Sequence, residues 1–163
     1  MPACWPAKTG AVSRDGRAVF LRIVAYGAPA PQGSKRHVGG GRMIESSKRV
    51  KPWRDDVKAA AEALIAPLRG DWVALDSPVR VRMVFTLRKP LSAPKRTATF
   101  PSRTPDLSKL LRSTEDALTD AGVWSDDARI IEYIRAAKVY PLEDPDALDT
   151  SGVLIEIWGL RDE

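Results

Sequence analysis

Cysteine and histidine are almost absent from this 163-residue chain, which contains one of each, Cys4 and His37. A single cysteine excludes a disulfide within the chain. The two residues together cannot supply the four ligands of a structural zinc site. Scarce cysteine is typical of proteins that work in a reducing compartment. We therefore expect a cytoplasmic protein whose chemistry depends on other side chains.

Long apolar runs are also lacking. No stretch approaches the length of about 20 apolar residues that a membrane-spanning helix needs. The first residues contain no apolar core of a secretion signal. We expect no membrane partner.

Acidic residues are scarce in the first 100 positions, which hold 19 Lys and Arg against 7 Asp and Glu, a net charge of +12. Residues 101–163 hold 7 and 14, a net charge of −7. A basic surface beside gathered acids suits a polyanionic partner and a metal site. An ordinary solvated surface with uneven charge explains the same numbers, so composition leaves both interpretations open.

The apolar patterns predict one α+β domain with a mixed sheet and two main helices. Residues 1–16 are expected to form a loose extension, and residues 17–163 the folded domain. The strands are expected at 18–26, 79–88, 129–140 and 153–158, and the helices run from Trp53 to near Pro67 and from Leu107 to Ala121. Within 79–88, almost perfect alternation places Arg80 and Arg82 on an outward face that suits DNA or a partner.

The stretch from Pro105 to Asp127 carries the candidate chemistry. Asp106 is expected to cap the second helix, and Asp127 follows in the loop beyond its end, next to Asp126. The helix is about 20 Å long at 1.5 Å per residue, so Asp106 and Asp127 meet only if the chain folds back along it. Together they then offer Mg²⁺ two carboxylates, with Arg112 as a nearby cation. A capped helix with a surface ion pair is the alternative.

Two loops are rich in basic residues that suit DNA phosphates. The first, Gly27 to Arg42, is rich in Pro and Gly, and the second, Lys89 to Arg103, leads directly into Asp106. Plain surface loops explain both equally well. The residues expected to contact DNA are Lys35, Arg36, His37, Arg42, Lys95, Arg96 and Arg103.

One family shares an ordered set of residues with this chain. Its members open a helix with Asp-hydrophobic-Asp, place a lysine one turn later, and continue with Asp-Ala-Leu, Gly, an aromatic residue and Asp-Asp. The corresponding residues here are Asp106-Leu107-Ser108, Arg112, Asp116-Ala117-Leu118, Gly122, Trp124 and Asp126-Asp127, with Lys138 at the place of a further family lysine. In this stretch the chain resembles the RusA family of Holliday-junction endonucleases, which is widespread in phages and prophages.

The resemblance implies a fold and an activity. It implies a small homodimer with a mixed sheet that requires Mg²⁺ or Mn²⁺. It also implies binding of four-way or branched DNA junctions, which are nicked symmetrically on two opposed strands during DNA recombination and repair. Two identical sites in a two-fold dimer match the two equivalent phosphates of a junction. By the same resemblance, Lys138 joins the DNA contacts.

Two positions depart from the family pattern. Ser108 stands where the second aspartate is usual and offers a metal only a neutral oxygen, so Asp126 or Asp116 is expected to compensate. Arg112 replaces a lysine and keeps the charge but not the compact ammonium. The alternative function is therefore a junction-binding protein that cuts slowly or not at all, and a nucleic-acid packaging adaptor without junction preference is a third.

Overall fold

The structure, a computed structural model, describes residues 21–159 except 34, 38, 39, 41, 42, 46, 47, 69 and 71. Side chains are not described for residues 35–37 and 43–45. The extension expected at 1–16 and the predicted DNA contact Arg42 therefore lie outside the described residues.

The centre of the fold is a four-stranded sheet in the order β1-β6-β4-β5. Strand β4 pairs with β5 in parallel, whereas β6 runs antiparallel to both β1 and β4. The sheet is therefore mixed, as the sequence predicts. Its strands are β1 (Leu21–Tyr26), β4 (Val79–Thr86), β5 (Ile130–Val139) and β6 (Gly152–Gly159).

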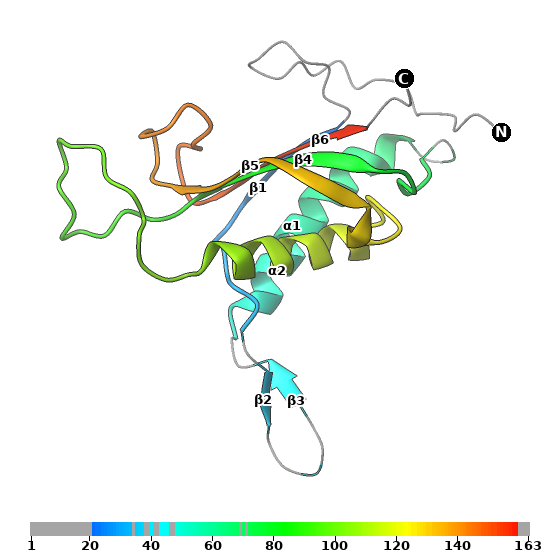
Figure 1. The fold of residues 1–163 in the computed structure, drawn as a ribbon, viewed down its shortest axis with the longest axis horizontal. Helices are drawn as coiled ribbons and strands as arrows, with labels where there is room; N and C mark the ends of the chain where they lie inside the picture. Colours follow the sequence, from blue (N-terminus) through cyan, green and yellow to red (C-terminus); the bar gives the residue numbers. More distant parts are fainter. Residues whose placement is uncertain are drawn as a thin grey trace.

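Two helices cover one face of this sheet, α1 (Val50–Ile65) and α2 (Leu107–Asp120), and they cross each other (Figure 1). Trp53 of α1 is 1 % exposed, and its indole N–H donates to Thr114 Oγ1 of α2 at 3.2 Å. Its ring lies 6.5 Å from that of Phe85 on β4. One side chain thus joins both helices to the sheet, and the predicted single α+β domain is confirmed.

Two boundaries differ from the sequence prediction. Helix α1 begins at Val50, three residues before Trp53, because Pro52 lies in the first turn, where its missing N–H has no helical partner to lose. The loop expected at 27–42 contains a short strand, β2 (Lys35–His37), which pairs with β3 (Met43–Glu45) as a hairpin that projects away from the helices (Figure 1).

The outward face of β4 is more buried than alternation predicts. Val84 and Thr86 are fully buried, and Thr86 Oγ1 accepts the backbone N–H of Leu148 from the loop between β5 and β6. Arg80 and Arg82 do not stand free on this face. The neighbouring strands place a carboxylate beside each of them. Arg80 lies 2.6 Å from Glu132, and Arg82 lies 2.9 Å from Glu156.

No helix within the described part of the chain is both long enough and apolar enough to pass through a bilayer.

Candidate functional site

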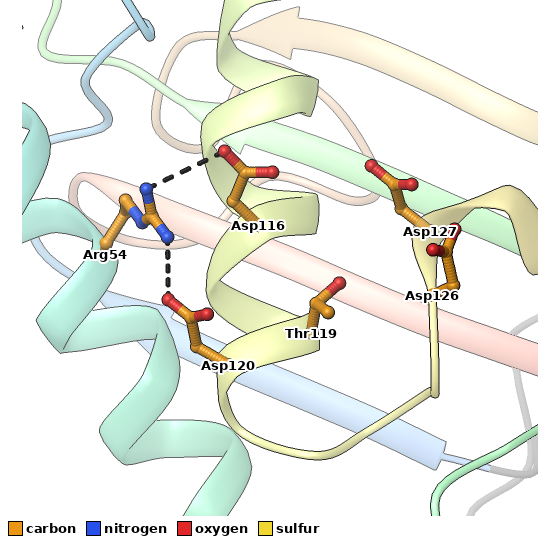
Figure 2. Close-up of a pocket in the computed structure, with 6 residues that line it drawn as sticks. All are labelled: Arg54, Asp116, Thr119, Asp120, Asp126 and Asp127. Carbon is orange, nitrogen blue, oxygen red and sulfur yellow. Dashed lines mark hydrogen bonds and ion pairs between the residues drawn. The ribbon is translucent and has the colours of Figure 1, made fainter.

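An acidic pocket of about 310 Å³ lies beside the C-terminal half of α2 (Figure 2). Three segments build it: α1, the last two turns of α2, and the turn that follows α2. We call it the acidic pocket, and its lining consists of Arg54, Asp116, Thr119, Asp120, Asp126 and Asp127.

The turn after α2 places the last two of these aspartates. Gly122 has φ of 76°, a left-handed conformation that other residues adopt only with strain, and it redirects the chain after the helix. The N–H of Ser125 then donates to the carbonyl of Leu75 at 2.9 Å. Asp126 caps the short helix Asp127–Arg129 by accepting a backbone N–H at 2.7 Å.

Side chains fasten this turn further. The hydroxyl of Ser125 and the guanidinium of Arg129 both donate to Asp76 Oδ1, at 2.5 and 2.9 Å. These bonds lower the pKa of Asp76. The indole N–H of buried Trp124 donates to Thr119 Oγ1 at 2.8 Å, which ties the turn to α2. The two pocket aspartates therefore stand on an anchored turn.

The pocket carries more negative charge than its surroundings offset. Burial raises the pKa of Asp127, and the neighbouring Asp126 and Asp116 raise it further. Glu115, one residue before Asp116 on α2, has a pKa raised to about 7 by burial and by the charges of Asp127 and Asp116, while Arg112 opposes the shift. A bound cation would relieve this repulsion.

One cation already stands at the pocket wall. Arg54 of α1 lies 2.6 Å from Asp120 and 3.7 Å from Asp116, as Figure 2 shows. It turns toward α2 and away from Asp126 and Asp127, so those two carboxylates point into the pocket without a basic partner in the drawn set. The pocket thus has a neutralised wall and an unneutralised wall.

Asp106 lies at the other end of α2. It is the residue before the helix, as expected, but its side chain caps no backbone N–H and instead lies 3.3 Å from the ammonium of Lys109. Ten residues separate it from Asp116, about 15 Å along the axis. The turn after Gly122 places Asp127 beside Glu115, Asp116 and Asp126. The chain reaches the end of α2 where Asp106 lies only later, at Lys138 of β5, so Asp106 does not line the pocket.

The acidic pocket offers a divalent metal ion few protein ligands and leaves the other coordination positions open. Among the described residues, no three His, Cys, Asp or Glu side chains form a group close enough to hold an ion. Asp126 and Asp127 nevertheless present adjacent carboxylates in a pocket with excess negative charge. Mg²⁺ usually takes one or two carboxylates and fills the remaining positions with water and substrate phosphate. The residues present therefore fit such an ion.

The remaining predicted residues are spread around α2. Ser108 and Arg112 are exposed on the helix, and Arg112 is close enough to Glu115 to lower its pKa. Lys138 donates to the carbonyls of Arg103 and Pro105 at 2.8 and 2.9 Å, so it holds the segment that leads into α2. Exposed side chains of the loop after β4 include Lys95, Arg96 and Arg103. The backbones of Lys35, Arg36 and His37 form β2.

Sequence reasoning missed part of the pocket. Arg54, Thr119 and Asp120 were not selected from the sequence, although Asp116 and Asp120 stand four residues apart on one helix face. That spacing could have predicted a basic partner from another element, and in the structure this partner is Arg54.

The comparisons with known proteins place the chain in a family. Residues 27–148, three quarters of the chain, match the family model described as Endodeoxyribonuclease RusA. The matched range includes α1, β4, α2, β5 and every residue of the acidic pocket. None of the curated protein sequences matches the chain.

Proposed function

Because the chain belongs to the RusA family of endodeoxyribonucleases, we propose that it is a Mg²⁺-dependent endonuclease that resolves four-way or branched DNA junctions by paired symmetric nicks. The observation that carries the proposal is the pair Asp126 and Asp127, presented by an anchored turn in a pocket with excess negative charge. Mn²⁺ is expected to substitute. The working form is a cytoplasmic homodimer, whose two sites meet the two equivalent strands of a junction.

The metal site is proposed at Asp127 with Asp126 beside it. The ion would neutralise charge on the scissile phosphate and lower the pKa of the attacking water. Asp106 and Ser108 are proposed as further ligands. They reach the metal only if the first turn of α2, on which Ser108 is exposed, moves toward Asp127 when DNA binds. Asp116 is already in the pocket and is the nearer compensation for Ser108.

The chain's own cations complete the mechanism. Arg112, one turn from Glu115, is proposed to stabilise the charge that grows on the phosphate as the bond breaks. The DNA strands are proposed to be held by phosphate contacts, with affinity that falls as salt rises. The residues proposed for these contacts are Lys35, Arg36, His37, Arg42, Lys95, Arg96, Arg103 and Lys138.

A labelled four-way junction in Mg²⁺ tests the proposal. The parent should release paired nicked products, and Asp127→Asn should not. Asp149→Asn serves as the matched control, because Asp149 is an exposed aspartate of the loop between β5 and β6. Equal nicking by the parent and by Asp127→Asn contradicts the site assignment.

A second function has specific support. Ser108 removes one carboxylate, Asp106 is engaged with Lys109, and the described residues contain no preformed group of three metal ligands. These observations favour a junction-binding protein with weak or no cleavage. It predicts a gel shift of the junction without nicking in Mg²⁺ or Mn²⁺. Recovery of nicking in Ser108→Asp would show that the scaffold supports cleavage and that the serine limits it.

A further inference from the structure

A second pocket, of about 420 Å³, opens at the N-terminal end of α2. Segments from six places in the sequence meet there: the chain after β1, the residue before α1, the chain after β4, the segment before α2, the residue after β5, and the residue before β6. Three arginines stand on its rim, Arg49, Arg88 and Arg103, and we call it the arginine pocket.

The three arginines are uncompensated. Among the residues that the structure describes, no aspartate or glutamate lines the pocket. All three side chains are exposed, and within the part of the chain that the structure describes their guanidinium groups form no ion pair or hydrogen bond. Elsewhere, the described cations are often paired, as Lys89 is with Glu143 on the neighbouring loops. Three positive charges around one cavity repel one another, and an anion bound between them would remove this unfavourable electrostatic energy.

The floor of the pocket is apolar. Leu87 and Tyr140 are both 9 % exposed, and Pro101 is buried. The ammonium of Lys89 lies 5.8 Å from the centroid of the Tyr140 ring. A cationic rim above an apolar floor matches a phosphate attached to a sugar better than it matches a free inorganic anion, because the floor gives the sugar a surface to pack against.

The distance between the arginine pocket and the acidic pocket indicates which phosphate of a bound DNA strand the arginine pocket would hold. The arginine pocket includes Pro105, two residues before α2, and the acidic pocket begins at Asp116 within α2. The helical stretch from Leu107 to Asp116 rises about 14 Å at 1.5 Å per residue, and the two residues before it add to that distance. Phosphates of one DNA strand advance about 3.4 Å along the helix axis. A strand cut at the acidic pocket therefore has a phosphate four to five nucleotides away at the level of the arginine pocket.

We propose that the arginine pocket binds one backbone phosphate, with its deoxyribose, of the DNA strand that is cut at the acidic pocket. This proposal rests on the proposed endonuclease function and adds to it a second contact with the strand, at a fixed distance from the first. Arg49 and Arg88 thereby become DNA-contacting residues. A grip at a fixed spacing sets which phosphate reaches the metal.

The test uses the full chain and a four-way junction with Ca²⁺ in place of Mg²⁺, so that binding is measured without turnover. Arg88→Gln and Arg103→Gln should each raise the Kd about tenfold, because each removes a charged hydrogen bond. Each should also reduce the slope of log K against log salt by about one. Lys58→Gln is the matched control, since it removes one positive charge from an exposed face of α1.

A scan with single methylphosphonates, which carry no charge, locates the phosphate. Neutral substitution four to five nucleotides from the cut should weaken binding of the parent about tenfold and add nothing in the Arg88→Gln, Arg103→Gln double variant. If the scan weakens parent and double variant equally, or if the arginine variants bind as Lys58→Gln does, the pocket does not hold that phosphate.

The outcomes separate the two proposals. If the parent nicks the junction and the arginine variants bind it with the parent's affinity, only the proposal for the arginine pocket is overturned. If the arginine variants bind DNA more weakly but the parent nicks no DNA in Mg²⁺ or Mn²⁺, the endonuclease function is overturned. Phosphate binding at the arginine pocket is then still supported. A parent that binds no DNA overturns both.

Discussion

The outer face of the sheet and the acidic pocket treat charge in opposite ways. On the sheet, Glu156 is 1 % exposed and accepts from Arg82 at 2.9 Å, with Arg22 at 3.7 Å. In the pocket, Asp126 and Asp127 share a turn, and burial together with the charge of Asp126 raises the pKa of Asp127. Paired buried charges fix a structure, whereas repelling charges are retained where a ligand will neutralise them. The difference therefore separates charge that holds the fold from charge that is left available to a ligand.

The largest expected effect removes a charge from the pocket. Asp127→Asn should lower junction nicking in Mg²⁺ about a thousandfold, because the proposed metal loses its main carboxylate. The melting temperature should stay the same or rise, since the substitution also reduces repulsion with Asp126. Single-turnover rates and thermal melts of the same preparation measure both. A large loss of stability would make Asp127 a structural residue like Glu156.

The matching substitution on the sheet should act on stability alone. Glu156→Gln breaks the buried ion pair of Glu156 with Arg82, and it should cost about 3 kcal/mol of unfolding free energy. Urea denaturation of the parent and the variant measures this. Nicking per folded molecule should be unchanged, and a loss of nicking beyond the folded fraction would link the sheet face to DNA.

A pH-dependent effect is expected at Glu115. Its pKa of about 7 lies above the ordinary value of 4.5, so the folded chain holds a proton that the unfolded chain has released between these values. Stability contributed by the protonated form is therefore lost as pH rises from about 4.5 to 7. In EDTA, Glu115→Gln should be about 1 to 2 kcal/mol more stable than the parent at pH 8.

At pH 4 the same two proteins should melt together, because Glu115 is then protonated in both states. Melting curves across this range provide the check. A gain that persists at pH 4 would have to come from packing rather than from charge.

The smallest expected effect is at Arg54, the pocket's own cation. Arg54→Gln should cost less than about 1 kcal/mol of stability, since Asp120 is largely exposed and Arg54 itself partly so. It should also tighten Mg²⁺ binding severalfold, because Asp116 loses its competing partner. Isothermal titration with Mg²⁺ measures this, and weaker Mg²⁺ binding would give Arg54 a direct supporting role at the metal.

Much of the fold follows from local pattern. Helix α2 has its apolar positions at helical spacing, Gly122 stops it, and β4 alternates along its first residues, so these elements were predicted close to their observed bounds. The burial of Thr86 was not predictable, because it depends on Leu148, 62 residues away in a loop without a regular period.

The site was predictable only where its residues are close in sequence. Asp126 and Asp127 were identified from their position after a helix-ending glycine. The pairing of Arg54 with Asp116 and Asp120 depends on the crossing of α1 over α2, which no local pattern encodes. The meeting of Arg49, Arg88 and Arg103 depends in addition on the sheet order. How far the chain folds back toward Asp106 is likewise a tertiary property.

Strand β6 comes last in chain order yet lies between β1 and β4. Until Gly152–Gly159 has left the ribosome and inserted, β1 and the β4–β5 pair have no hydrogen-bonded connection. The helices that frame both pockets pack on that sheet, so the shape of both pockets depends on the pairing of β6 with β1 on one side and with β4 on the other.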